Sequence, residues 1–184
     1  MENFEKETIA AIATALSDSG IGIVRISGEN AIYIVDSIFR STSGKKILTK
    51  VQSHTIHYGY IVDKDENIID EVMTSVMKAP KSYTMEDTVE INCHGGVLVM
   101  QKVLETVLQA GARLAEPGEF TKRAFLNGRI DLSRAEAVID VIHSQNEYAL
   151  SSSVSQLKGR LSDKIRSLRE DILYQIAFIE SALD

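Results

Sequence analysis

The sequence predicts an α+β fold, a mixed sheet with packed helices, followed by long α-helices of a second, helical domain. Short apolar runs rich in β-branched residues, separated by polar turns, fill much of the first 118 residues and indicate strands. Segments with apolar residues at helical spacing lie between these runs, whereas the last third shows helical spacing alone. We therefore expect an α+β domain over residues 1–125 and the first helices of a helical domain over 126–184.

The first domain is expected to alternate between strands and helices. The strands that we expect cover residues 8–14, 21–26, 55–62, 68–77, 88–93 and 112–115. Residues 63–67 form a polar turn, so the strands on either side should pair antiparallel. One helix is expected around residues 31–38 and a second from residue 97 onward, with Gly111 as the residue just past its end.

The last third predicts helices with a long exposed apolar stripe. Ser133 and Glu136 have the spacing of a capping box, which predicts a helix start. A stripe with a mean spacing of about 3.6 residues then predicts one straight helix over residues 149–184, roughly 50 Å long. The stripe consists of Leu150, Val154, Leu157, Leu161, Ile165, Leu168, Ile172, Ile176 and Ile179. Its cover is either a second subunit or later helices of a longer protein, and we favour the longer protein.

Composition excludes several classes of protein. Hydrophobic residues make up 44% and charged residues 25% of the chain, which excludes a largely disordered protein. Every apolar run is too short to span a membrane. The first seven residues are acidic where a secretory leader would be basic, and Cys93 is the only cysteine. We therefore expect a cytoplasmic protein.

The sequence contains no standard motif of a catalytic or metal site. The chain has no phosphate-loop motif, so GTP hydrolysis by this chain alone is not expected. Its four histidines lack the spacing of a zinc site, so we expect no metal ligands. The net charge of −6 argues against a general nucleic-acid binder. Only residues 113–134, with five basic and three acidic side chains, are a candidate anion-facing segment, and the net charge disfavours RNA binding there.

Three charged residues stand out as candidate ligand contacts. Arg25 and Glu90 each lie between apolar neighbours in a predicted strand, where a charge needs a partner. They either pair with each other or lie on a solvated sheet face, or they line a ligand cleft. Arg129 lies at an element boundary, either as a ligand contact or as a solvated loop residue.

The motif Cys93-His94-Gly95-Gly96 is expected at a strand-to-helix turn. An exposed thiol there would have a lowered pKa and would be reactive. The alternative, which we favour, is a small buried cysteine with glycines that allow a tight turn. His94 has no evident acidic partner in the sequence, so no catalytic triad is predicted.

Several motifs in order resemble one family. They are TIAAIAT at 8–14, GIGIVRISG at 20–28, SYTMED at 82–87, VEINCHGG at 89–96, EPGEFTKRAFLNGRIDL at 116–132 and AEAVID at 135–140. Together they are similar to the N-terminal region of the MnmE (TrmE) family of tRNA modification GTPases. Family members often have glycine where Met85 stands and a Pro- and Gly-rich stretch at residues 15–19. These departures affect the geometry of two loops.

The resemblance implies a folate-binding α+β domain that forms a homodimer, followed by part of a helical domain. The inserted GTPase domain, which uses GTP, Mg²⁺ and K⁺, and the C-terminal helices would lie outside this sequence. The family acts with MnmG to add an aminomethyl or carboxymethylaminomethyl group to carbon 5 of the wobble uridine, U34, in certain tRNAs. No membrane association is implied.

Family folate positions carry over to Arg25, Glu90 and Arg129, with 5-formyl-tetrahydrofolate or a related tetrahydrofolate as ligand. A carboxylate can accept paired hydrogen bonds from the N–H edge of a pterin, whereas arginines suit the carboxylates of the glutamate tail. Gly95, Gly96 and Arg123 belong to the same motifs but are expected to lie farther from the ligand. The alternative is a structural dimerisation scaffold whose folate site is weak or lost.

Overall fold

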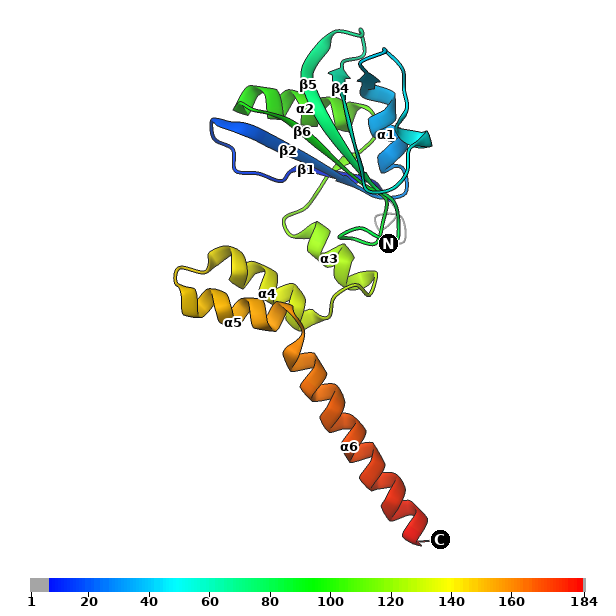
Figure 1. Cartoon of the computed structure of the whole chain (residues 1–184), viewed down its shortest axis with the longest axis vertical. Helices are drawn as coiled ribbons and strands as arrows, with labels where there is room; N and C mark the ends of the chain where they lie inside the picture. Colours follow the sequence, from blue (N-terminus) through cyan, green and yellow to red (C-terminus); the bar gives the residue numbers. More distant parts are fainter. Residues whose placement is uncertain (1–6, 184) are drawn as a thin grey trace. The chain divides into compact units, whose positions relative to one another are not determined.

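The computed structural model describes the backbone of residues 7–183 and the side chains of 7–160 and 163–181. The chain has the predicted α+β class (Figure 1). It divides into two compact units, Met1–Arg123 and Ala124–Asp184, and each is described by itself. The first six residues, whose acidity argued against a leader, lie outside the described part of the chain.

The first unit contains a seven-stranded sheet of order β3-β4-β5-β6-β2-β1-β7. The strands are β1 Ile9–Ile12, β2 Ser19–Ser27, β3 Phe39–Ser41, β4 Thr55–Val62, β5 Ile68–Met77, β6 Thr88–Gly95 and β7 Arg113–Leu114. All neighbours pair antiparallel except β1 and β7, which are parallel, so the sheet is mixed as predicted. The expected hairpin of β4 and β5 is confirmed.

Two helices cover one face of this sheet, α1 (Ala31–Ile38) and α2 (Val97–Gln109). Val24 and Ile26 of β2 and their partners Ile91 and Val89 of β6 are fully buried in one core with both helices. The period-2 alternation of a strand places every second residue on this face. Gly111 follows the last residues of α2 with φ +116°, which confirms its predicted role.

The opposite face of the sheet carries the alternate residues. Arg25 and Glu90 lie there between the buried positions of β2 and β6. Toward β4 and β5 the same face exposes apolar side chains, with Ile56 67%, Tyr58 52% and Met73 47% exposed. This face therefore combines an ion pair with uncovered apolar surface.

The remaining helices are α3 (Glu119–Leu126), α4 (Leu132–His143), α5 (Glu147–Leu157) and α6 (Arg160–Leu183), besides a short 3₁₀ helix at Leu48–Lys50. The capping-box prediction is wrong, because Asp131 caps α4 by accepting a hydrogen bond from the Arg134 N–H. An aspartate two residues earlier than Ser133 is the cap, so the helix begins at Leu132. Among the described residues, no helix is long and apolar enough to cross a membrane.

The single long helix predicted over residues 149–184 is also wrong. The helix α5 ends at Leu157 with Lys158 as its C-cap, and the next residue, Gly159, leaves helical geometry with φ +82°. A glycine readily takes this left-handed conformation, so it ends α5 and lets α6 begin in a new direction. The predicted apolar stripe continues along α6, where Ile165, Leu168 and Ile172 are 51–61% exposed.

Candidate functional site

Arg25 and Glu90 form an ion pair across β2 and β6. The antiparallel register places their Cα atoms directly opposite each other, and Arg25 Nε donates to Glu90 Oε1 at 2.7 Å. The side chains are 30% and 23% exposed, respectively. The first sequence interpretation, that the two residues pair with each other, is therefore confirmed.

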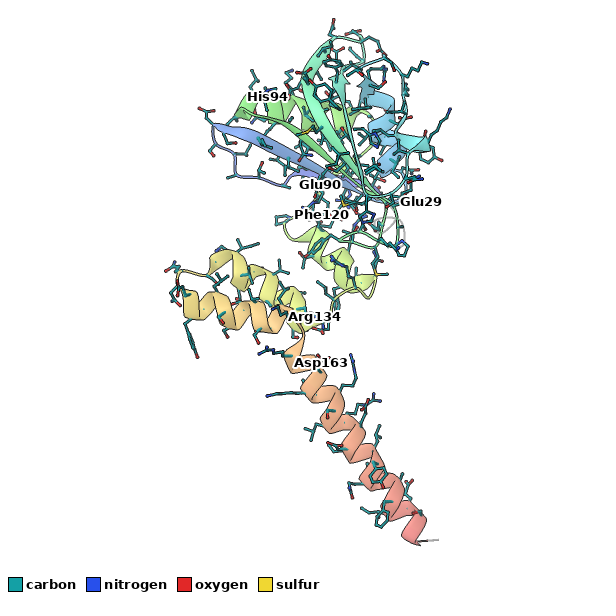
Figure 2. All side chains as sticks on the ribbon, viewed as in Figure 1. Glu29, Glu90, His94, Phe120, Arg134 and Asp163 are labelled. Carbon is teal, nitrogen blue, oxygen red and sulfur yellow. The ribbon has the colours of Figure 1, made fainter. Side chains whose placement is uncertain are left out.

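Two aromatic rings lie next to the Arg25 guanidinium. Its central carbon, Cζ, is 6.0 Å from the ring centroid of Tyr83 and 5.7 Å from that of Phe120. Tyr83 belongs to the loop before β6, and Phe120 to the first turn of α3 (Figure 2). Both distances allow cation–π attraction, which holds the guanidinium over the sheet face. Sequence reasoning had missed both rings.

The ion pair retains hydrogen-bonding capacity. Within the described residues, Arg25 makes a hydrogen bond only through Nε, and Glu90 accepts one only at Oε1. The two terminal guanidinium nitrogens and Glu90 Oε2 are therefore available to a ligand. A planar group with N–H donors next to a carbonyl could donate to Glu90 Oε2 and accept from the guanidinium nitrogens.

A buried hydrogen-bond network fixes the loop that carries Tyr83. Ser27 Oγ donates to Glu86 Oε2 at 2.7 Å and lies 2.6 Å from Thr84 Oγ1. Arg123, only 6% exposed, donates to both carboxylate oxygens of Glu86 at 3.3 Å. These contacts position Tyr83 and Phe120, because they tie the loop to β2 and to α3.

Arg113 and Arg123 share a second acidic partner, Glu119. Arg113 Nη2 and Arg123 Nη2 lie 2.7 Å and 3.1 Å from Glu119 Oε1. Burial alone would raise the pKa of this carboxyl, but hydrogen bonds from Arg113, the Glu116 N–H and Arg123 outweigh it and lower the pKa to about 2. Two cations of the candidate anion-facing segment, residues 113–134, are thus taken up by internal ion pairs.

The Cys93-His94-Gly95-Gly96 motif differs from its predicted turn, because β6 continues to Gly95. Cys93 is 4% exposed, and burial raises the pKa of its thiol to about 11, which confirms a buried cysteine. His94 has an acidic partner that the sequence did not reveal: Asp70 Oδ1 lies 2.7 Å from its Nδ1. Asp70 also accepts a hydrogen bond from the backbone N–H of His94, near the end of the β5–β6 pairing.

Comparison with known proteins decides the family. Residues 8–129 match the family model described as GTP-binding protein TrmE N-terminus, and residues 132–184 match the MnmE helical domain. The chain belongs to the MnmE family. It comprises the N-terminal region and the helical region of that family of tRNA modification GTPases.

Curated relatives named tRNA modification GTPase MnmE support this assignment. The chain is 64% identical over 178 residues to the protein of Lachnoclostridium phytofermentans, covering 97% of this chain and 39% of the relative. It is 57% identical over 181 residues to that of Geobacillus kaustophilus, covering 98% and 39%. It is 53% identical over 179 residues to that of Bacillus subtilis, covering 97% and 39%. The chain spans about two fifths of the length of these relatives.

Met85, where the family resemblance led us to expect a glycine, has an unusual backbone conformation. Met85 has φ +61°, in the left-handed region that favours glycine. The residue lies between Thr84 and Glu86, which make the network beneath Tyr83. Methionine therefore occupies a backbone conformation that glycine would adopt more readily.

Arg129, the third MnmE position carried over from the resemblance, belongs to the second unit. It is exposed, and its backbone N–H donates to the Ala124 carbonyl at 2.9 Å after α3. The geometry of the first unit therefore brings together Arg25 and Glu90, and Arg129 remains a sequence-based candidate. Among the described residues, no three His, Cys, Asp or Glu side chains gather as a metal site.

Proposed function

We propose that this chain is the folate-binding, dimerising part of a tRNA modification GTPase, with 5-formyl-tetrahydrofolate or a related tetrahydrofolate as ligand. One observation carries the proposal: the Arg25–Glu90 ion pair on the sheet face has two aromatic rings within 6.0 Å of its guanidinium and keeps donors and an acceptor available. The pyrimidinone ring of a tetrahydropterin is flat and has an N–H edge and a carbonyl, so it matches these features. When bound, the tetrahydrofolate supplies the one-carbon unit.

The short distance between Arg25 and Glu90 indicates that both side chains contact the same part of the ligand. A folate molecule places its pterin and its glutamate carboxylates at opposite ends, whereas the two side chains are 2.7 Å apart. Both side chains must therefore contact the same end of the folate molecule. Glu90 accepts from the pterin N–H edge, and Arg25 donates to the neighbouring carbonyl. For the carboxylates of the tail, Arg129 stays a candidate from the sequence alone.

The same sheet face supports dimerisation. Ile56, Tyr58 and Met73 expose apolar surface beside the ion pair, and a second copy of the chain would bury it. In the complete protein, the dimer acts with MnmG on U34 of certain tRNAs, and GTP, Mg²⁺ and K⁺ belong to the GTPase domain. We place this activity in the cytoplasm.

The alternative is a dimerisation scaffold with a weak or lost folate site. The feature that favours it is that Arg25 and Glu90 already satisfy each other's charge. A ligand must then add hydrogen bonds without breaking the pair. The two functions differ in ligand binding and agree on the dimer, so folate affinity separates them.

A calorimetric titration with 5-formyl-tetrahydrofolate tests the proposal. Arg25→Ala and Glu90→Gln should each weaken binding at least tenfold, because each removes charge-assisted hydrogen bonds. Arg40→Ala and Glu66→Gln are matched controls, since these residues form an ion pair elsewhere, at β3 and the β4–β5 turn. If the protein is folded and dimeric but shows no saturable binding, the folate-binding proposal is wrong and the scaffold function is favoured.

A further inference from the structure

Positive charge is concentrated at the junction of α5 and α6. Between residues 158 and 169 the chain has five basic side chains and one acidic, a net charge of +4, although the whole chain carries −6. The basic residues, all exposed, are Lys158, Arg160, Lys164, Arg166 and Arg169. Within the described side chains the only ion pair here joins Arg166 to Asp163, at 3.8 Å. The other four charges face solvent without an acidic partner in that part of the chain.

A hollow of about 430 Å³ adjoins this charge. It is lined by Tyr148, Ser151, Ser152, Ser155, Gln156 and Arg160. The α5 residues follow the spacing of one helix face, and none of the six is acidic. Tyr148 is 87% exposed, which is unusual for a ring of its size in a folded unit. The hollow therefore offers an aromatic face, hydroxyl and amide groups, and a guanidinium.

Arg134 packs against the same junction, and its charge is already paired, because its Nε lies 3.6 Å from Asp131 Oδ2. Its Nη2 lies 3.5 Å from the Lys158 carbonyl, and a side chain on Gly159 would overlap its guanidinium. The first turn of α6 starts here, so its free N–H groups and positive helix end reinforce the field of the side chains.

We propose that the α5–α6 corner, residues 148–169, binds an RNA strand. The arginines and lysines neutralise phosphates, Tyr148 stacks on an unpaired base, and the Ser and Gln side chains bond to 2′-hydroxyls or base edges. An acidic protein would use the charges but would have no need for an exposed ring beside a row of hydroxyls. The inference rests on the proposed function only in the choice of tRNA as the RNA.

Fluorescence anisotropy with a fluorescein-labelled, unmodified tRNA transcript tests this surface between 50 and 200 mM salt. One variant removes three cations of the corner: Arg160→Gln, Lys164→Gln and Arg169→Gln. The control removes three exposed lysines of the first unit: Lys45→Gln, Lys46→Gln and Lys50→Gln. At about 100 mM salt the corner variant should bind at least tenfold more weakly, and its log–log salt slope should fall by about 2. The control should change neither quantity, and both variants should keep the helical circular dichroism signal.

A second comparison separates RNA from an acidic partner. Tyr148→Ser should weaken binding of a single-stranded oligouridylate about fivefold or more, through lost stacking, and leave the salt slope unchanged. Equal competition by oligouridylate and by a polyglutamate of the same charge, with no effect of Tyr148→Ser, would assign the corner to acidic proteins. Equal losses in the corner variant and the lysine control, or no tRNA binding at 50 mM salt, would also overturn the inference. A successful folate titration on the same sample would then show that this inference fails separately from the proposed function.

Discussion

Gly159 makes room for Arg134. The guanidinium of Arg134 lies where a side chain on Gly159 would have to be, and Gly159 adopts φ +82°. The two residues come from the α5–α6 junction and from α4, so a single glycine both ends a helix and admits a neighbouring side chain. The next helix, α6, begins directly after this glycine, at Arg160.

Gly159→Ala should lower the free energy of unfolding by about 1–2 kcal/mol, because alanine is strained in the left-handed conformation and would displace Arg134. Urea unfolding monitored by circular dichroism measures the change. Gly20→Ala is the matched control, since Gly20 has no atom within 4 Å of an added Cβ. A more stable, more helical Gly159→Ala protein would show that α5 and α6 prefer to form one continuous helix.

This junction also shows where sequence reasoning fails. The apolar stripe from Leu150 to Ile179 has one period throughout, so periodicity alone predicts one helix. The break depends on the conformation of Gly159, and a lone glycine in a helical pattern does not reveal its φ. The same limit applies to Ser133, where two adjacent capping signals compete and Asp131 forms the cap.

The strands were easier to predict than the site. β4 and β5 have their predicted bounds because each alternates apolar and polar residues between clear turn signals. β3 has only three residues and α3 lies in a segment rich in turn residues, so neither has a readable period. Arg25 and Glu90 were found because a charge among apolar neighbours is conspicuous. Tyr83 and Phe120 were missed because only tertiary folding brings their rings to Arg25.

Met85 provides a test of backbone strain near the site. Met85→Gly should be more stable than Met85→Ala by about 1 kcal/mol, because only glycine relieves the cost of φ +61°. In an ordinary strand or helix the order would be reversed. Thermal and urea unfolding of the two variants give the comparison, and an alanine variant as stable as the glycine variant would argue against strain at this residue.

Glu119 should make stability depend on pH in the acid range. Its pKa is about 2 in the folded state and 4.5 in the reference state, so its contribution is complete above pH 4.5 and is lost as the pH falls toward 2. The loss should reach about 3 kcal/mol. Urea unfolding at pH 7, 4.5 and 3 measures it.

Glu119→Gln should lower stability at pH 7 and flatten this acid dependence, whereas Glu116→Gln, at an exposed position, should do neither. If the Glu119→Gln protein lost stability between pH 4.5 and 3 as steeply as the parent protein, the dependence would belong to other carboxyls.

Phe120 should contribute to folate binding through its ring. Phe120→Leu keeps an apolar side chain but removes the aromatic face, and it should weaken 5-formyl-tetrahydrofolate binding about three- to tenfold, the range of a cation–π or stacking contact. Phe125→Leu makes the same change on α3 at a residue that is 40% exposed. If the two variants bound 5-formyl-tetrahydrofolate equally well, Phe120 would not contribute to the folate site.

The central claim is that Arg25 and Glu90 together hold the pterin end of a tetrahydrofolate. A crystal structure of the chain with 5-formyl-tetrahydrofolate tests it most directly. We expect pterin N–H groups within about 3 Å of Glu90 Oε2 and the pterin carbonyl within reach of an Arg25 terminal nitrogen. A pterin bound away from this pair, or a glutamate tail in its place, would contradict the claim.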